Sequence, residues 1–478
     1  MTRVYGLTRS DARRDSYKDP LSPIHSTRAM DPSNDLFEIY DVVVVGGGPV
    51  GLATALECAK ARKKVLVLEQ SVFYNQSGSS GDIVRMFRTA YTEDFMADLA
   101  VQSMSLWEAL EKEAGEPLRM MSGLLNFGDP NYGEGGPEGT LKGPIPNLER
   151  HGMAFTLLDR NGIQEKFPFQ NLPDGWEGID MPDNGCINVP LLLRTMYHLC
   201  RAHGVRLFDY ATVEMITAAP TSSPAKWSVM GKMRNPKGTS AQARDFAFGT
   251  KKIAITAGAY VNHILFPSFK FTLNLEIWEM VYEYYAIDSA VNFKKMWFQF
   301  QENSTRAGKQ VSNLFYGFPS VPWGPPNLCR IAVDSATNVI SDPDQRKYAV
   351  ISQEDLENTR TWIHNHILGV GPHPLPVFAG TCLQTNVSDN MFVLDFVPER
   401  YLPKEAAESI VVFTAGWAMK FVPLLGRVLK QLLLDGAAPE YDISHFALDR
   451  PGIIRDGPVV QAVLPHGLTG SCVHRLGH

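Results

Sequence analysis

The stretch DVVVVGGGPVG occupies residues 41–51 and is followed by a helical segment and by the run VLVL at residues 65–68. The valine run predicts a buried parallel strand, and the order of strand, glycine-rich turn, helix and second strand is that of a dinucleotide-binding unit. Gly46 permits the tight turn, Gly48 lets the backbone approach a pyrophosphate, and Gly51 lets helix and strand pack closely.

The helix that follows the glycines suits a phosphate, because its first N–H groups are free and carry a partial positive charge. Glu69 directly follows the second strand, where a carboxylate can accept hydrogen bonds from ribose hydroxyls. Since all five parts occur in order, a purely structural glycine loop is a much weaker interpretation. The motif alone does not separate FAD from NAD.

The composition limits the possible partners. The 478 residues are too many for one compact core and suit two domains. Hydrophobic residues make up 44% of the chain and charged residues 20%, which is typical of soluble globular proteins. The formal net charge of −6, without a strongly basic stretch, argues against nucleic acid or an anionic membrane as a partner. We find no apolar run of the ~18 residues that would span a bilayer.

The cysteines and the two ends of the chain indicate where in the cell the protein is expected. The six cysteines are widely spread and contain no Cys-x-x-Cys pair, so we expect neither a disulfide framework nor a metal site. Residues 1–37 are mostly polar, lack the apolar core of a signal peptide, and are expected to be a disordered extension. Residues 475–478 are not an SKL-type peroxisomal signal. These features predict a cytoplasmic location.

Two kinds of pattern alternate along the chain. Helical periodicity covers residues 93–114, 189–203, 353–368 and 422–434. Further strand patterns cover residues 123–128, 205–210, 247–256, 278–287, 296–300, 314–318 and 409–413. Residues 83–88 are expected to form a helical turn, and the Gly- and Pro-rich residues 129–147 a surface loop. Strand–helix–strand units separated by sheet-rich insertions imply two interleaved domains.

Several separate motifs then resemble one family in their order and spacing. They are the glycine fingerprint, SGDIVRMFR at 80–88, ITAGAY at 255–260, YGFP at 316–319, CLQTN at 382–386, and Ala415-Gly416 with Lys420 before the last helix. Over about residues 40–452 the chain resembles the monomeric sarcosine oxidase family of FAD-dependent amine oxidases, whose relatives include pipecolate, N-methyl-tryptophan and fructosyl amino acid oxidases. The resemblance implies a D-amino acid oxidase-like α/β fold, in which a Rossmann-type FAD-binding domain is interleaved with an antiparallel-sheet substrate domain.

The same resemblance suggests domain boundaries and partners. We expect the FAD-binding domain to comprise residues 38–122, 185–262 and 381–452, the substrate domain residues 123–184 and 263–380, and residues 453–478 to form a tail. The family is usually monomeric, so a monomer acting on a small amino acid and oxygen is expected.

Cys382 is implied to carry FAD covalently, as a thioether to the 8α-methyl group. This chemistry needs a thiolate beside the dimethylbenzene edge of an oxidised flavin. A free buried cysteine is the alternative that the residue alone leaves open. Other residues expected to bind FAD are Gly46, Gly48, Gly51, Glu69, Ser80, Val213 and Met419.

Three cations are candidates for the active site. Arg85 and Arg88 would share one face of a helical turn. By resemblance, Arg85 lies near the flavin ring as a catalytic residue, whereas Arg88 and Lys420 bind the substrate carboxylate, for which a guanidinium offers two parallel hydrogen bonds. Solvent-exposed side chains are the alternative. The loop before Lys420 is shorter than in the family, so Trp417 is expected to fill part of the pocket.

The chain departs from the family at three further positions. Arg330 stands where the family has a lysine that promotes the reaction with oxygen; it keeps the charge but cannot deprotonate. Asp334 replaces a histidine and Gln384 a tyrosine on the substrate side. Tyr316 is expected to line the substrate side, or to be a packed strand aromatic. These differences indicate a substrate other than sarcosine, larger and aromatic.

The expected function is oxidation of a secondary, N-methyl amino acid by hydride transfer to the flavin. This gives hydrogen peroxide and an imine or iminium that is hydrolysed or trapped by intramolecular cyclisation. Two alternatives stay open: a fructosyl amino acid oxidase, and a flavin-binding protein without oxidase turnover. An aromatic hydroxylase is disfavoured because its late Gly-Asp motif does not occur after residue 390.

Overall fold

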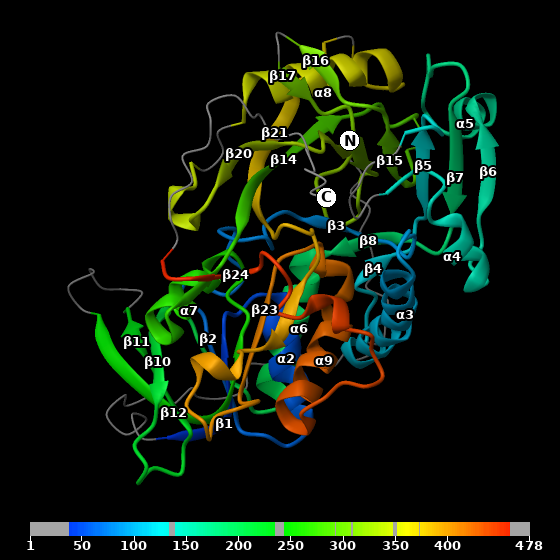
Figure 1. Cartoon of the computed structure of the whole chain (residues 1–478). Helices are drawn as coiled ribbons and strands as arrows, with labels where there is room; N and C mark the ends of the chain where they lie inside the picture. The colour runs from blue at the N-terminus through cyan, green and yellow to red at the C-terminus, as the bar shows by residue number, and fades with distance from the viewer. Residues whose placement is uncertain are drawn as a thin grey trace, which may run out of the picture.

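The computed structural model describes residues 38–132, 139–234, 243–291, 293–306, 309–347, 351–371 and 373–458. Its two main sheets form two bodies, one below the other in Figure 1. The lower body combines a largely parallel sheet with helices, and the upper body is built on a mostly antiparallel sheet. The expected α/β architecture, with a dinucleotide-binding sheet and an antiparallel sheet, is therefore confirmed.

The lower sheet forms around the valine run. Strand β1 (Ile39–Val45) lies between β2 (Val65–Leu68) and β12 (Arg244–Ile255) and is parallel to both. The sheet has eight strands in the order β10-β11-β12-β1-β2-β9, with β23 paired to β12 and β22 paired to β23. The other strands are β9 (Arg206–Phe208), β10 (Ala211–Ala218), β11 (Trp227–Met233), β22 (Val393–Phe396) and β23 (Ile410–Thr414).

Helices bury one face of this sheet in a single core. They are α2 (Pro49–Lys60), α3 (Asp94–Ala114), α6 (Val189–Ala202) and α9 (Val422–Asp435). Helix α2 begins directly after the glycine turn, with Gly48 at its N-cap and Pro49 at its first position, where a missing N–H costs nothing. Helix α9 packs closely on α2, because a Cβ at Gly426 would lie 2.6 Å from that of Ala53. Helix α7 (Val261–Phe269) packs in the core on the other face.

The upper sheet has nine strands in the order β20-β14-β19-β18-β15-β5-β7-β6, with β21 also paired to β14. Its pairs are antiparallel except for β15 with β5. The strands are β5 (Leu124–Gly128), β6 (Thr156–Asp159), β7 (Glu177–Met181), β14 (Glu276–Ala286), β15 (Met296–Phe300), β18 (Phe315–Phe318), β19 (Leu328–Val333), β20 (Ala336–Ile340) and β21 (Pro376–Asn386). Helices α5 (Arg160–Lys166) and α8 (Gln353–His366) cover it, and Trp297 stacks on Trp362 between sheet and α8.

Shorter elements complete the described chain. A small sheet of β3 (Val84–Phe87), β8 (Gly185–Asn188) and β4 (Arg119–Met120) lies between the two bodies. Strand β13 (Phe271–Leu273) pairs with β24 (Ile454–Asp456), and β16 (Ser304–Arg306) with β17 (Lys309–Val311). Helix α4 (Ile145–Arg150) precedes β6.

Residues 84–87 do not form the predicted helical turn. Strand β3 pairs antiparallel with β8, so the partner that fixes this segment lies far along the chain and is invisible in local spacing. Asp82, just before the strand, has a φ of +93°, which is incompatible with the start of a right-handed helix. Arg85 and Arg88 therefore do not share a helix face.

Most other expected elements are confirmed within a few residues of their ends. The loop predicted over 129–147 is corrected in two respects: α4 begins at Ile145, and Leu141 is fully buried. Residues 133–138 of that loop lie outside the described residues, as do residues 1–37 and 459–478, which include most of the two predicted terminal extensions. Strand β21 runs through position 381, where a domain boundary was predicted, and the division into segments stays a prediction.

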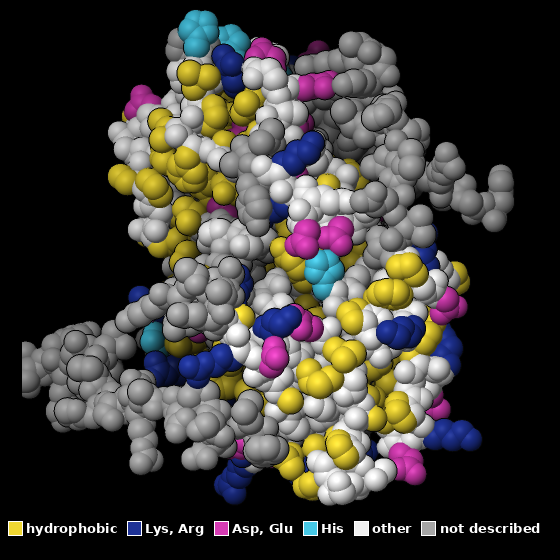
Figure 2. Space-filling view, turned by 90° about the vertical axis from the view of Figure 1, so that its left-hand side faces the viewer, with side chains coloured by type: hydrophobic (Ala, Val, Ile, Leu, Met, Phe, Trp, Pro, Cys, Tyr) yellow, Lys and Arg dark blue, Asp and Glu magenta, His cyan; other side chains and the backbone are white. Residues whose placement is uncertain are grey.

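The described surface carries both signs of charge. Figure 2 shows lysine and arginine interspersed with acidic side chains over the lower part of one face, and hydrophobic side chains gathered over its upper left. Within the described residues, the helices are all too short or too polar to cross a membrane.

Glu283 is a carboxylic acid enclosed in the upper body. Its side chain on β14 is inaccessible to solvent and accepts a hydrogen bond from the Tyr285 hydroxyl. Burial raises the pKa of Glu283 from 4.5 to about 8; the Tyr285 hydroxyl opposes this rise and the nearby Asp355 carboxylate adds to it. In the unfolded chain the same group ionises near its ordinary pKa.

We expect Glu283→Gln to remove part of the pH dependence of stability. Between pH 4.5 and about 8 unfolding releases a proton from Glu283, so the free energy of unfolding falls as pH rises, by up to about 1.4 kcal/mol per pH unit. In thermal unfolding from about pH 5 to 8.5, the melting temperature of the variant should rise relative to that of the wild type as pH rises. The matched control is Glu276→Gln, at an exposed position of the same strand. Parallel wild-type and Glu283→Gln profiles would contradict the raised pKa.

Candidate active site

One cavity of about 360 Å³ runs between the two bodies. Its walls come from the glycine turn, the loop 74–80, and strands β14, β18, β19 and β21, together with residues 413–420. Every residue predicted for the site lines this cavity except Gly51, which lies behind the glycine turn. Residues almost four hundred positions apart in the sequence are therefore brought together as expected, although their individual roles are not thereby tested.

The glycine turn has the geometry that a bound pyrophosphate requires. Gly46 has a φ of +106°, and a Cβ there would lie 2.6 Å from the Thr256 carbonyl oxygen. A Cβ at Gly51 would lie 2.0 Å from the Gly46 carbonyl oxygen, so both positions need glycine. At Gly48 a Cβ would meet only Ser80 Oγ, at 3.9 Å, because the residue faces the cavity.

Glu69 lies beside this turn. Its carboxylate accepts hydrogen bonds from the backbone N–H groups of Gly47, at 2.8 Å, and Ser71, at 2.9 Å. Burial raises the pKa of Glu69, and these two bonds partly offset that rise. Val213 lines the cavity beyond it, next to an irregularity in the pairing of β10 with β11. This end of the cavity suits the adenosine part of a dinucleotide.

Cys382 lines the same cavity from the upper sheet. It is on β21 across from Met280 of β14, its residue is 7% exposed, and it packs with Ala336 and Trp417. Burial raises the pKa to about 12 for the thiols of four other cysteines, Cys58, Cys186, Cys200 and Cys329. Among the described cysteines, Cys382 is the one that lines the cavity.

Arg346 was not predicted and joins the two walls beside Cys382. Its guanidinium donates to the carbonyl oxygens of Ser77, at 2.7 Å, and Thr381, at 2.5 Å. The carboxylate of Glu279 on β14 lies 3.7 Å from its Nε. Arg346 thus ties the loop below the cavity to the residue that precedes Cys382. Its own sequence context, between a short turn and a helix, gave no signal of this role.

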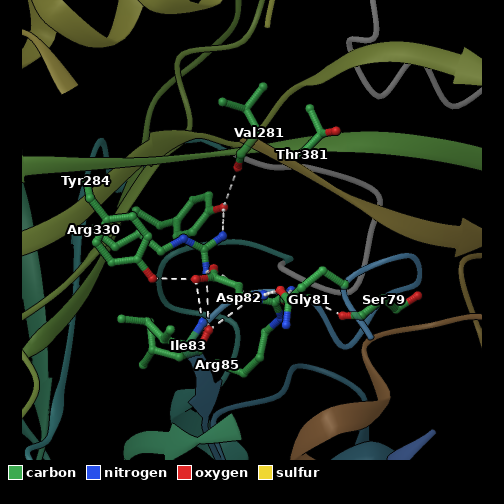
Figure 3. Close-up of polar contacts among 12 residues, drawn as sticks. Ser79, Gly81, Asp82, Ile83, Arg85, Val281, Tyr284, Arg330 and Thr381 are labelled. Carbon is green, nitrogen blue, oxygen red and sulfur yellow. Dashed lines mark hydrogen bonds and ion pairs between the residues drawn. The ribbon is translucent and has the colours of Figure 1, made fainter. Parts of the chain in front are cut away.

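Arg330 is held in a buried network (Figure 3). Its Nη1 lies 2.9 Å from the Asp82 carboxylate, and its Nη2 donates to the Tyr316 hydroxyl at 2.7 Å. Burial alone would lower the pKa of Arg330, but Asp82, followed by Tyr316 and Tyr284, raises it above its ordinary value. Arg330 therefore stays charged. Asp82 and Tyr284 were missed as site residues, although Asp82 is part of the motif at residues 80–88.

Arg85 points its guanidinium at its own segment. It donates to the carbonyl oxygens of Ser79, Gly81 and Val84 and to the Asp82 carboxylate, as Figure 3 shows for several of these contacts. Its side chain borders the cavity while its polar atoms organise the loop. The catalytic role predicted for Arg85 stays a prediction.

Arg88 and Lys420 both lie close to the Tyr91 ring. The guanidinium carbon of Arg88 lies 4.9 Å and Lys420 Nζ 5.5 Å from the centre of the Tyr91 ring. Both cations are buried and both line the cavity. The backbone of Lys420 is fixed because its carbonyl oxygen accepts hydrogen bonds from Ser103, at 3.1 Å, and Trp107, at 2.7 Å. Two neighbouring buried cations form a favourable site for an anion.

The remaining predicted residues also line the cavity. The Tyr316 hydroxyl donates to the Val281 carbonyl oxygen at 3.2 Å, and burial raises the pKa of Tyr316 to about 12. The Gln384 amide donates to Asn386 at 3.1 Å. Asp334 is half-buried, and its charge contributes to the raised pKa of Tyr316. Trp417 and Met419 lie in the segment after β23 and also border the cavity.

Two polar atoms of cavity-lining residues lack a hydrogen-bond partner within the part of the chain that the structure describes, which bears on whether a polar ligand suits the cavity. Arg330 Nε and Thr385 Oγ1 are buried and have no hydrogen-bond partner among the described residues. Buried polar atoms normally have partners, so these positions call for polar groups of a ligand. Together with the open glycine turn in the same cavity, these residues fit FAD.

A histidine and two aspartates also meet at the junction of the bodies. His263 Nε2 on α7 lies 3.0 Å from Asp342, and the possible ligand atoms of His263, Asp342 and Asp344 lie within 4.8 Å of one another. All three are partly or fully exposed, and such groups commonly occur without an ion. We interpret the cluster as a polar contact between the bodies.

Comparison with protein families matches residues 41–432 to the model described as FAD dependent oxidoreductase. This match covers most of the described chain and both bodies. It agrees with the glycine turn, the acid after β2 and the cavity that joins them.

Individual proteins are similar over nearly the same stretch. The chain is 49% identical, over 89% of its length, to a Dictyostelium discoideum protein named as a bifunctional amine oxidase, but spans 38% of that protein's length. It is 26% identical to the monomeric sarcosine oxidase of a Bacillus strain, covering 87% of this chain and 97% of that one. Among solved structures, the open form of NikD, an amino acid oxidase essential for nikkomycin biosynthesis, is 32% identical with a TM-score of 0.73, covering 86% of this chain and 97% of that one.

Proposed function

Because the chain belongs to the FAD-dependent oxidoreductase family and resembles its sarcosine oxidase branch, we propose that it is an oxidase of a secondary, N-methyl amino acid. The observation that carries this proposal is the pair of buried cations, Arg88 and Lys420, in the cavity that also contains the glycine turn and Cys382. A carboxylate is the substrate group that such a pair binds best.

Different residues of the cavity would bind different parts of FAD. The N–H groups at the start of α2 and the Gly46–Gly48 backbone would bind the pyrophosphate. Glu69 would bind the ribose, and Ser80, Val213 and Met419 would contact the remainder. Cys382 would form a thioether bond with the 8α-carbon of the flavin. When bound, FAD accepts a hydride equivalent from the C–H beside the substrate amine and is reoxidised by oxygen.

The protein then needs to orient the amine and exclude water. Arg88 and Lys420 would hold the carboxylate, while Met86, Phe298 and Trp417 form apolar parts of the wall. Asp334 and Gln384 offer polar contacts at the same end, which suits a substrate larger than sarcosine. The product would be an imine or iminium, which is hydrolysed or trapped by cyclisation, together with hydrogen peroxide. Arg330 would supply positive charge for the oxygen reaction.

We further propose that the protein acts as a monomer and that its FAD-binding domain is formed by residues 38–122, 185–262 and 381–452. The substrate domain would be formed by residues 123–184 and 263–380. The lower and upper sheets support this division, since each is built mainly from one of these sets of segments.

The test is an absorbance spectrum of the purified protein, followed by anaerobic addition of N-methyl amino acids and, in parallel, fructosyl amino acids. We expect a flavin spectrum that one N-methyl amino acid bleaches, and peroxide once air is admitted. Bleaching by the fructosyl compounds alone would redirect the proposal to a deglycating oxidase. A flavin spectrum that no amine bleaches would favour a flavin-binding protein without turnover.

A further inference from the structure

The carboxylate of Asp82 is the centre of the polar network beside the cavity (Figure 3). Its Oδ2 lies 2.9 Å from Nη1 of both Arg85 and Arg330. Its Oδ1 accepts hydrogen bonds from the Tyr284 hydroxyl and, at 2.7 Å, from the N–H of Ile83. A carboxylate offers about four acceptor positions, so all of them are occupied. Asp82 therefore has no free position with which to take a proton or bind substrate.

The network joins the small sheet between the two bodies to the upper body. Asp82 and Arg85 belong to the segment that enters β3, Tyr284 to β14 and Arg330 to β19. The side chain of Asp82 is 1% exposed and that of Arg330 4% exposed. Asp82 also keeps a φ of +93°, which is unfavourable for a residue with a side chain. Glycine would relieve the strain at this position but would leave the four donors without their acceptor.

The charges of the network do not cancel. Two guanidinium groups face one carboxylate, so the network carries one net positive charge in a region sheltered from water. Without Asp82 it would carry two. Arg330 and Arg85 both border the cavity, so this charge acts directly on whatever occupies it.

We propose that Asp82 is a positioning residue that fixes the Arg330 guanidinium at the cavity wall and sets the net charge of this network, beside the bound flavin, at one positive charge. The proposal rests on FAD occupying the cavity with its ring near Cys382, but not on the identity of the substrate. Arg330 in turn acts on the flavin as a fixed cation, because Asp82 and the Tyr316 hydroxyl hold two of its nitrogen atoms.

Sulfite is a suitable probe of this charge. It adds its electron pair to an oxidised flavin and bleaches the visible absorbance, and the adduct is negatively charged, so its affinity increases with positive charge near the ring. For a unit charge about 10 Å away at an effective dielectric constant of about 20, the dissociation constant should change about tenfold.

The test compares the flavin-loaded wild type with Asp82→Asn, Arg330→Gln and the double variant, whose net charge equals that of the wild type. Asp82→Asn should bind sulfite about tenfold more tightly and Arg330→Gln about tenfold more weakly, while the double variant returns to within about threefold of the wild type. The matched control is Asp98→Asn on the exposed side of α3, which should leave the dissociation constant unchanged.

A purely structural role for Asp82 predicts a different ranking of the sulfite affinities. In that case Asp82→Asn and the double variant would both bind sulfite more weakly than the wild type, and the proposal would be overturned. If Asp82→Asn does not retain flavin, Arg330→Gln decides: a tenfold weaker affinity supports the proposal and an unchanged affinity overturns it. A wild type without flavin would instead contradict the proposed function, whereas a flavin-loaded wild type without amine turnover would leave this test intact.

Discussion

Replacement of Cys382 by serine is expected to abolish covalent flavin attachment completely. The wild type should keep its yellow colour in the pellet after acid precipitation, and Cys382→Ser should release all of it into the supernatant. The reason is chemical, because a serine hydroxyl is not ionised at neutral pH and is a far poorer nucleophile than a thiolate. The structure supports the choice of residue, since Cys382 is the one described cysteine that borders the cavity.

Cys329→Ser provides the matched control. Cys329 is also buried on a strand of the upper sheet, but it packs into the core beside Trp297 and Trp362 and does not line the cavity. This variant should keep its colour in the pellet. A yellow pellet from Cys382→Ser would show that another residue carries the bond. Release of all colour from the wild type itself would show that FAD is held without any covalent bond. Mass spectrometry of the intact chain gives the same distinction independently.

The part of the site that the sequence predicted best is the part fixed by local constraints. Gly46 and Gly51 are required by backbone conformation and close packing within a few residues of one another, and Glu69 follows the adjacent strand. Such constraints act over short stretches of chain, so they leave a recognisable pattern. The expected strand, turn, helix and strand all occur where the pattern places them.

Prediction failed where the decisive partner is distant. The spacing of Arg85 and Arg88 suited a helical turn, but β8 draws the segment into a strand. Tyr284 and Asp82 are 202 positions apart and Arg346 and Ser77 are 269 apart, so no local pattern could join them. For Cys382, Arg88 and Lys420 it was the resemblance to a family, and not their own spacing, that placed them in one site.

The predicted role of Arg330 also looks different once its neighbours are known. The sequence shows an arginine where the family has a lysine, which suggested a positive charge that supports the reaction with oxygen but cannot deprotonate. In the structure Asp82 and Tyr316 engage both terminal nitrogens, so the charge is fixed in place and partly compensated. A sequence gives the type of charge at a position but not the groups that hold it.

Arg88→Ala is expected to lower kcat/KM for the amino acid substrate by about 100- to 1000-fold. The side chain is buried beside Lys420 over the Tyr91 ring, and its loss would leave a substrate carboxylate in a water-poor site with one cation fewer. Truncating one partner of a buried, hydrogen-bonded charge pair costs about 3 to 4 kcal/mol, which corresponds to this factor. Steady-state kinetics on the flavin-loaded variant measure it.

The choice of substrate separates binding of the carboxylate from a general loss of structure. With the corresponding amine that lacks the carboxylate, Arg88→Ala and the wild type should differ by less than about threefold, because the interaction is already missing. Lys420→Met should likewise lower kcat/KM only for the substrate that has the carboxylate. The loop of this variant should keep its conformation, since Trp107 and Ser103 bind the backbone oxygen of Lys420 and not its side chain. Arg150→Ala, at a half-exposed position on α4, is the matched control and should behave as the wild type. An equal loss with both substrates would assign Arg88 a structural role, and no loss with either would place the carboxylate elsewhere in the cavity.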